Sequence, residues 1–273
     1  MKKREFSYGA VFLIGLIFSI LGFIINMLFT GSAMPDPNTV NTAADAAKST
    51  GQISLISTII SGIVAWFGQF IIASGLINNR RGSVGDYFGQ VKRINGKIFV
   101  VNLLIVLITS LITLAFGGMS FLSLSVENPG ALLSTALVGF VISLIFGLLV
   151  AYANHVLADP RNRNMGVGES IKKIFTVGGR LIGKTILVYL KFFILPLVVM
   201  ILIGVGISFI SKSPETIFGL SFIAFGIAGI YAILITPFIS ARISDNYLNL
   251  EGEIDSRDDI FIEGSNNDFT MTR

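Results

Sequence analysis

The sequence predicts an all-α, polytopic integral membrane protein. Of its 273 residues, 53% are hydrophobic and 13% are charged, whereas a typical soluble domain has about 25% charged residues. The charged residues are also segregated, and the apolar stretches between them are about 20 residues long, which is the length of a membrane-spanning helix. A basic segment occurs twice, at 82–97 and 166–180, and in both copies an acidic residue precedes a basic residue at the same distance. This repeat indicates a chain built from duplicated units.

Six apolar stretches are long enough to cross a bilayer. Backbone groups in lipid must be satisfied within their own segment, so we expect each stretch to be a helix. The predicted spans are residues 8–29, 53–77, 98–118, 132–157, 185–210 and 217–241. We predict one domain of residues 1–243, in which six transmembrane helices form three hairpins with short amphipathic elbow helices on the cytoplasmic side.

The distribution of lysine and arginine predicts the orientation. Basic residues are concentrated before the first span, in residues 80–97 and in residues 161–184, whereas the opposite side has only Lys48 and Lys212. Basic loops stay in the cytoplasm, so both termini should be cytoplasmic. Residues 31–33 also resemble a signal-peptidase site, and cleavage there would leave five spans and an external N-terminus. We favour an uncleaved span, because the first apolar run exceeds the usual 7–15 residues of a signal peptide.

The two repeated segments predict the elbow helices. The offset from Asp86 to Lys97 equals the offset from Glu169 to Arg180. Apolar residues recur at helical spacing in both segments, with basic residues on the other face, so each should lie in the inner headgroup layer. Ser83 and Asp86 form a plausible capping box. We expect the chain to turn into the next span at 95–96 in the first segment and at 178–179 in the second.

The composition excludes several kinds of chemistry. The chain has no cysteine and one histidine, His155, so thiol chemistry and multi-histidine metal sites are ruled out. No catalytic, cofactor-binding or metal-binding constellation is present, and we expect neither a cofactor nor a nucleic-acid partner. Residues 244–273 are acidic and polar, and we predict a disordered cytoplasmic tail.

Two groups of polar residues are candidate contacts. Faces of small residues on the spans indicate close helix packing, or alternatively a polar cavity, whose natural contacts would be Asn26, Gln69 and Asn102. Contacts with anionic headgroups or another anion are expected from the second group, which comprises Lys191, His155, Lys97 and Arg180. Lys191 is the one charge inside an apolar stretch and should extend to the inner interface. His155 should lie at that interface.

An acid-capped basic elbow that leads into a span and is repeated between hairpins resembles the membrane domain attached to some glycerophosphodiester phosphodiesterases. It also resembles related uncharacterised six-helix proteins of Gram-positive bacteria. The residues that carry the resemblance are those from Gly85 and Asp86 to Lys97, and from Gly168 and Glu169 to Arg180. The phosphodiesterase domain itself is missing here, so no catalysis can be carried over from the family. The resemblance implies a bacterial plasma-membrane location and little else.

These observations leave two main functions open. The first is a non-enzymatic accessory, regulatory or protective membrane module, with the lipid bilayer, its anionic headgroups and a membrane or cytoplasmic protein as partners. The alternative is a permease or transporter subunit for a lipid-like or amphipathic substrate, which would need a separate ATPase because this chain has no nucleotide-binding motif. An intramembrane lipid enzyme is disfavoured, since no nucleophile, base or metal cluster is visible.

Overall fold

The computed structural model describes residues 4–31, 43–123, 129–194 and 214–252, together with Pro196, Val198, Leu202 and Gly206. This part of the chain is all-helical. Its main helices are α1 (Tyr8–Gly31), α2 (Ala43–Asn78), α3 (Val84–Gly89), α4 (Gly96–Ser123), α5 (Pro129–Val150), α6 (Ala153–Ala158), α7 (Val167–Tyr189) and α9 (Pro214–Leu250). Two 3-10 turns, η1 (Gln90–Arg93) and η2 (Pro160–Asn162), and a π-helix, η3 (Leu190–Ile194), complete them.

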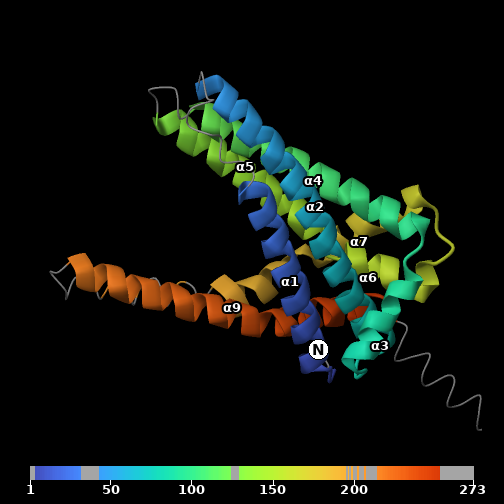
Figure 1. Ribbon diagram of the computed structural model, residues 1–273. Coiled ribbons are helices and arrows are strands. Elements are labelled where there is room, and N and C mark those ends of the chain that lie inside the picture. The colour runs from blue at the N-terminus through green and yellow to red at the C-terminus, as the bar shows by residue number, and fades with distance from the viewer. Residues whose placement is uncertain are drawn as a thin grey trace, which may run out of the picture.

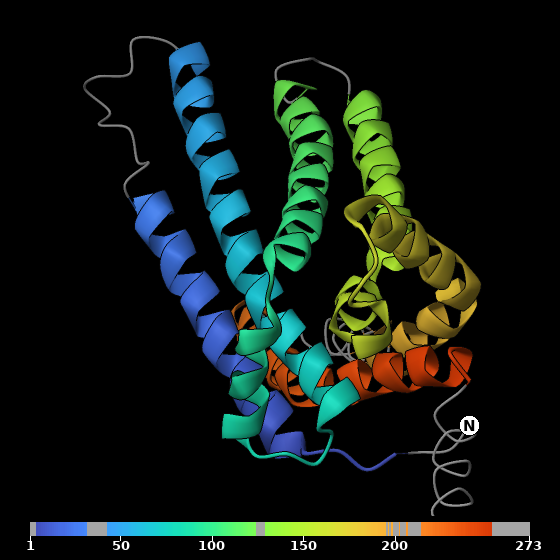
Figure 2. The ribbon, with the colours of Figure 1, turned by 90° about the vertical axis from the view of Figure 1, so that its right-hand side faces the viewer.

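Four helices of the described part are long and apolar enough to cross a membrane. These candidate spans are Tyr8–Leu28, Ile56–Asn78, Gly96–Thr113 and Leu137–Ala158. The helices that contain them rise together from a common base, α1 beside α2 and α4 beside α5 (Figure 1). The long helix α9 runs across this base at a steep angle to them (Figure 2).

The hydrophobic core lies mainly near the base. One cluster joins α2, α4, α6, α7 and α9 around Trp66, Phe70, Tyr152 and Tyr247. A second cluster joins α1, α2 and α3 around Ile14, Leu76 and Tyr87. Farther from the base, side chains such as Phe23 and Phe140 are about two-thirds exposed, as expected of surfaces that face lipid tails. Among the described side chains, burial is therefore greater at the base than farther along the helices.

The two repeated segments fold differently. In the first, the predicted capping box forms between Ser83 and Asp86, and the chain turns at 94–95 before α4 begins. The Asn95 side chain caps α4 by accepting a hydrogen bond from the Ile98 N–H at 3.0 Å. In the second segment the equivalent residue is Gly178, which has no side chain to cap a new helix. The predicted turn at 178–179 is wrong, because α7 continues through both glycines to Tyr189.

Gly178 instead allows α7 to approach α5 closely. A Cβ atom added at Gly178 would overlap the carbonyl oxygen of Leu149 and lie 2.6 Å from its carbonyl carbon. Gly75 has a similar role on α2, where an added Cβ would overlap the ring of Tyr87. These two glycines are therefore packing positions, at which another part of the chain occupies the space of a side chain.

Two further elements differ from the predicted spans. The predicted span 132–157 is interrupted at 151–152, so that His155 lies on the separate short helix α6. Helix α9 extends to Leu250, and residues 244–248 are buried, although we predicted that the disordered tail begins at 244. The rest of the predicted tail, 253–273, lies outside the described residues.

The π-helix η3 precedes Pro196, and this proline explains why a carbonyl of η3 accepts a hydrogen bond from another helix. Proline has no backbone N–H, so the carbonyl of Phe192, four residues earlier, loses its usual helical donor. The hydroxyl of Tyr231 on α9 donates to this carbonyl oxygen at 2.9 Å. This bond links η3 to α9.

Candidate functional site

Charged and polar side chains connect the helix ends at the base of the bundle. We call this cluster the polar base. Its residues are Arg80, Lys97, Asp159, Arg161, Asn162, Lys173, Asp245, Tyr247 and Glu251. The N-terminal segment and the two basic loops meet here, since the Ser7 N–H donates to the Arg80 carbonyl and the Lys97 ammonium donates to the Asn162 and Arg163 carbonyls. This contact agrees with the prediction that they share one side of the membrane.

Asp159 is the most heavily hydrogen-bonded member of the polar base. Its carboxylate accepts from the Arg161 backbone N–H and Nε at 3.0 Å and from Nη2 at 2.6 Å. The Tyr247 hydroxyl donates to Oδ2 at 2.8 Å. Tyr247 also accepts from Asn162 Nδ2 at 3.3 Å. Asp159 therefore joins the loop after α6 to the end of α9.

A second buried pair joins α9 to the loop after α2. Arg80 Nη2 lies 2.6 Å from Asp245 Oδ1, and the two side chains are 12% and 5% exposed. The Arg80 guanidinium also donates to the carbonyl oxygens of Glu5 and Ala241. A third pair, Lys173 with Glu251 at 3.1 Å, connects α7 to the residue after α9.

The two buried carboxylates have opposite pKa shifts. Burial raises the pKa of Asp159, but hydrogen bonds from Arg161 and Tyr247 outweigh it, so that the net pKa is below the ordinary value. Burial also raises the pKa of Asp245, and there the attraction of Arg80 and Arg242 offsets only part of it, so the net pKa is above the ordinary value. Burial raises the pKa of Tyr247, and the adjacent Asp159 carboxylate raises it further.

These directions predict opposite responses to acid. A carboxylate whose pKa is lowered on folding stabilises the protein above its unfolded pKa of about 3.9, and this contribution is lost as the pH falls through the folded pKa. The stability advantage of the unmodified protein over Asp159→Asn should therefore shrink on acidification below about pH 4. Its advantage over Asp245→Asn should grow, because the folded state binds that proton more tightly. Unfolding midpoints in detergent between pH 6 and pH 3 measure both differences, and parallel curves would contradict the assignment.

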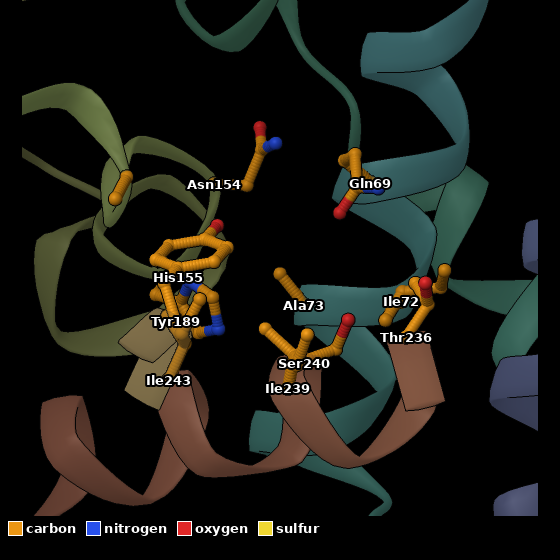
Figure 3. Close-up of a pocket in the computed structure, with 11 residues that line it drawn as sticks. Gln69, Ile72, Ala73, Asn154, His155, Tyr189, Thr236, Ile239, Ser240 and Ile243 are labelled. Atoms are coloured by element: carbon orange, nitrogen blue, oxygen red, sulfur yellow. The ribbon is translucent and has the colours of Figure 1, made fainter. Parts of the chain in front are cut away.

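A cavity of about 310 Å³ lies above the polar base, between α2, α6, α7 and α9. We call it the inner cavity. Figure 3 shows Gln69, Asn154, His155 and Tyr189 around the space, with Ile239 and Ser240 on its α9 side. The complete lining comprises Gln69, Ile72, Ala73, Ala151, Asn154, His155, Tyr189, Thr236, Ile239, Ser240 and Ile243. None of these residues is an acid, a lysine or an arginine.

His155 is the least satisfied polar group of the inner cavity. Its side chain is only 7% exposed, and neither ring nitrogen has a hydrogen-bond partner among the described residues. The ring lies 6.0 Å from the rings of Tyr152 and Tyr247, centroid to centroid. The neighbouring Asn154 uses its amide oxygen to accept from the Trp66 indole at 3.0 Å.

A second cavity of about 410 Å³ has a basic lining. We call it the basic cavity, and its lining residues are Arg4, Phe6, Lys191, Phe192, Phe238, Ala241, Arg242 and Asp245. The Lys191 ammonium lies 5.8 Å from the centre of the Phe192 ring. Three cations against one carboxylate favour an anion such as a phosphate headgroup.

The structure does not bring the predicted cavity residues together. Gln69 lines the inner cavity. Asn26 accepts from the Ser57 hydroxyl at 2.6 Å and so connects α1 to α2. Asn102 is buried and donates to the Ile98 carbonyl within α4.

The predicted anion contacts are likewise distributed. Lys191 lines the basic cavity, and Arg180 is exposed on α7. Lys97 donates to two backbone carbonyls. We predicted that the His155 side chain lies at the membrane interface, but the structure buries it. The break after α5 directs α6 into the core.

Several residues that line these sites were missed from the sequence, among them Asn154, Ser240, Asp245 and Tyr247. A signal was available for α9, since Ile239, Ile243 and Tyr247 recur at steps of four, and the last two lie beyond the predicted end of the span at 241. The contact between Asp159 and Tyr247, 88 positions apart, had no such signal.

Within the described residues, no group of three or more His, Asp or Glu side chains is placed to hold a metal ion. No family model, no curated protein and no solved structure matches this chain. The resemblance to the membrane domain of glycerophosphodiester phosphodiesterases therefore stays a prediction.

Proposed function

We propose that this chain is a non-enzymatic module of a bacterial plasma membrane, which supports, regulates or protects a partner protein. The observation that carries the proposal is the polar base. Its ion pairs fix the loop after α2, the loop after α6 and helix α7 to the end of α9. Alternating access requires one part of a transporter to move against another around the substrate site, and a base connected in this way favours a static scaffold.

We further propose six crossings with both termini in the cytoplasm. Four candidate spans support the membrane part of this topology, and the meeting of the basic loops at the base supports the common cytoplasmic side. The apolar residues 185–210 and 217–241 would supply the remaining two crossings. Since α9 runs at a steep angle to the other helices (Figure 2), its crossing would be strongly tilted.

Helix α7 offers the surface for a cytoplasmic contact. Lys172, Arg180 and Lys184 are exposed on it, while Ile174, Val177 and Leu181 of the same helix are buried in the core. An exposed basic face on a fixed helix can contact either anionic headgroups or an acidic surface of a partner protein.

Affinity purification in mild detergent tests the proposal. We expect another membrane protein to be recovered in a fixed ratio with the unmodified chain, and to be lost from the triple variant Lys172→Gln, Arg180→Gln and Lys184→Gln. The variant Arg81→Gln is the control, because that exposed arginine lies in a different loop. The proposal would be contradicted if the chain were recovered from native membranes at full yield without any partner protein.

The second candidate function is a permease subunit for an amphipathic substrate. The inner cavity favours it, because a space lined by both polar and apolar side chains lies between the helices. The same purification distinguishes the two functions, since a permease subunit should bring down a cytoplasmic ATPase.

A further inference from the structure

The basic cavity collects cations from three segments that are far apart in the sequence. Arg4 belongs to the N-terminal segment, Lys191 to η3 and Arg242 to α9, and together they line a space of about 410 Å³. Cations around one space repel one another, and an anion bound between them removes that cost. The lining therefore favours an anionic ligand.

The one carboxylate of the lining does not balance these charges. Asp245 Oδ1 lies 2.6 Å from Arg80 Nη2, and Arg80 does not line the cavity. Arg242 Nη1 is 3.7 Å from Asp245 Oδ2, which is beyond hydrogen-bond distance. Asp245 is therefore paired mainly with Arg80, and the Arg242 guanidinium, whose side chain is 28% exposed, keeps donors for a ligand.

Contacts that do not involve these cations hold the walls of the basic cavity together. Phe6 packs edge-on against Phe238, with ring centres 5.9 Å apart, and joins the N-terminal segment to α9. On the other side, the bond from the Tyr231 hydroxyl to the Phe192 carbonyl joins η3 to α9. The cations are thus carried by walls that are already in place, which lowers the cost of binding.

A phosphate group suits this set of donors. Arginine binds phosphate oxygens in a bidentate manner, and lysine binds them as a point charge. A tetrahedral phosphate can accept from three directions at once, whereas the two oxygens of a carboxylate accept mainly in one plane. Donors that arrive from three separate segments therefore match a phosphate better than a carboxylate.

The apolar surroundings indicate that the phosphate belongs to a lipid. Three aromatic side chains share the lining with the cations, namely Phe6, Phe192 and Phe238. A free phosphate ion would gain nothing from them. Exposed apolar side chains flank Lys191 on η3, at Leu190 and Ile194, and Leu234 is exposed one turn before Phe238 on α9. These side chains offer a surface for hydrocarbon chains.

The positions of the three cations fit the depth of a headgroup. Arg4 precedes the first predicted span, Arg242 directly follows the last one, and Lys191 lies near the beginning of the fifth. All three therefore belong to the predicted cytoplasmic ends of spans, where basic side chains meet the headgroup layer.

We propose that the basic cavity binds the phosphate group of an anionic phospholipid, with its acyl chains along the exposed apolar side chains of η3 and α9. A lipid with a net negative charge is favoured over a zwitterionic one, because the lining cations repel a choline or ethanolamine group. The site goes beyond the proposed module, since it needs no partner protein.

Native mass spectrometry of the purified full chain tests the site. The delipidated protein in mild detergent is titrated with dioleoyl phosphatidylglycerol, with dioleoyl phosphatidylcholine or with inorganic phosphate. One phosphatidylglycerol should bind per chain, about tenfold or more tightly than phosphatidylcholine, which has the same acyl chains and phosphate but no net charge. Inorganic phosphate at the same concentration should not displace the bound lipid.

A double variant and a matched control locate the binding. Lys191→Gln with Arg242→Gln removes two lining cations and should weaken phosphatidylglycerol binding by about tenfold or more, because hydrogen bonds between charged groups are the strong ones. Lys172→Gln with Lys184→Gln removes the same charge from exposed positions of α7 outside the cavity and should leave the affinity unchanged.

Two single variants keep the test decisive if the Arg242 replacement prevents folding. The Lys191 side chain is exposed, so Lys191→Gln should fold and should weaken phosphatidylglycerol binding by about threefold or more. Lys191→Arg keeps the charge and should keep the affinity.

Any of four results would overturn the proposal. These are equal affinity for the two lipids, displacement of phosphatidylglycerol by inorganic phosphate, undiminished binding in the folded cavity variants, and equal losses in the cavity variant and its α7 control. The measurement uses the chain without a partner protein, so failure of this site and failure of the proposed module are separately visible.

Discussion

Replacing Gly178 with alanine is expected to separate α7 from α5 and to cost about 3 kcal/mol or more, at or above the usual overpacking range of about 1–3 kcal/mol. The added methyl group would overlap the Leu149 carbonyl oxygen, which belongs to the backbone and cannot rotate away. Relief requires the two helices to move apart, which would open the core around Ile174, Val177 and Leu181. Thermal unfolding in detergent, followed by loss of the monodisperse peak on size exclusion, measures this effect.

Gly179 is the matched control. It is the next residue on the same helix, it is exposed, and an added Cβ would meet nothing within 4 Å. Alanine in a helix interior is favoured over glycine by about 0.5–1 kcal/mol, so Gly179→Ala should be neutral or slightly stabilising. Equal behaviour of the two variants would refute the close approach of α5 and α7.

Replacing Asp159 with asparagine is expected to cost about 3 kcal/mol, the lower end of the range for removing one partner of a buried ion pair. The change leaves the Arg161 guanidinium without its counter-charge. Burial raises the pKa of Asp159, but the hydrogen bonds and the charge of Arg161 bring the pKa below the ordinary value, so the folded state favours the ionised carboxylate here. Denaturant titration of the purified protein gives the loss of free energy of unfolding.

Two comparisons make this result specific. Glu5→Gln breaks the pair of Glu5 with the adjacent Arg81, whose side chains are 79% and 74% exposed, and should have little effect because exposed pairs contribute little. The double variant Arg161→Met and Asp159→Leu removes both charges and should recover much of the lost stability. A double variant as unstable as Asp159→Asn would show that the hydrogen bond between Tyr247 and Asp159, and not the ion pair, holds this corner of the protein.

The helical membrane character of this chain was predictable because it depends on composition and local pattern. Charge segregation and apolar length suffice for that, and the capping box at Ser83 needs only residues three apart. The continuation of α7 was harder to predict. Asn95 and Gly178 occupy equivalent positions of the repeat, but only the first can cap a helix, and the second is packed against a carbonyl from another helix.

The candidate sites were less predictable, because they depend on contacts between distant segments. Gln69 was identified as a cavity residue from its polarity within an apolar span, and it lines the inner cavity. Asn26 and Asn102 have the same polarity, but a serine of α2 and a carbonyl of α4 satisfy them. From the sequence, Asp245 was assigned to a solvated tail together with Tyr247. Their burial in the protein is explained only by their buried partners, Arg80 and Asp159.

The concentration of buried side chains and ion pairs at one end of the bundle has a mechanical consequence. The polar base makes its end of the molecule stiff, whereas many described side chains farther along α1, α4 and α5 are exposed. A thicker or thinner bilayer would therefore act on the far ends of these helices, while the end with the polar base keeps its shape. Lipid composition would in this way change the spacing of the far ends without disturbing the two cavities beside the polar base.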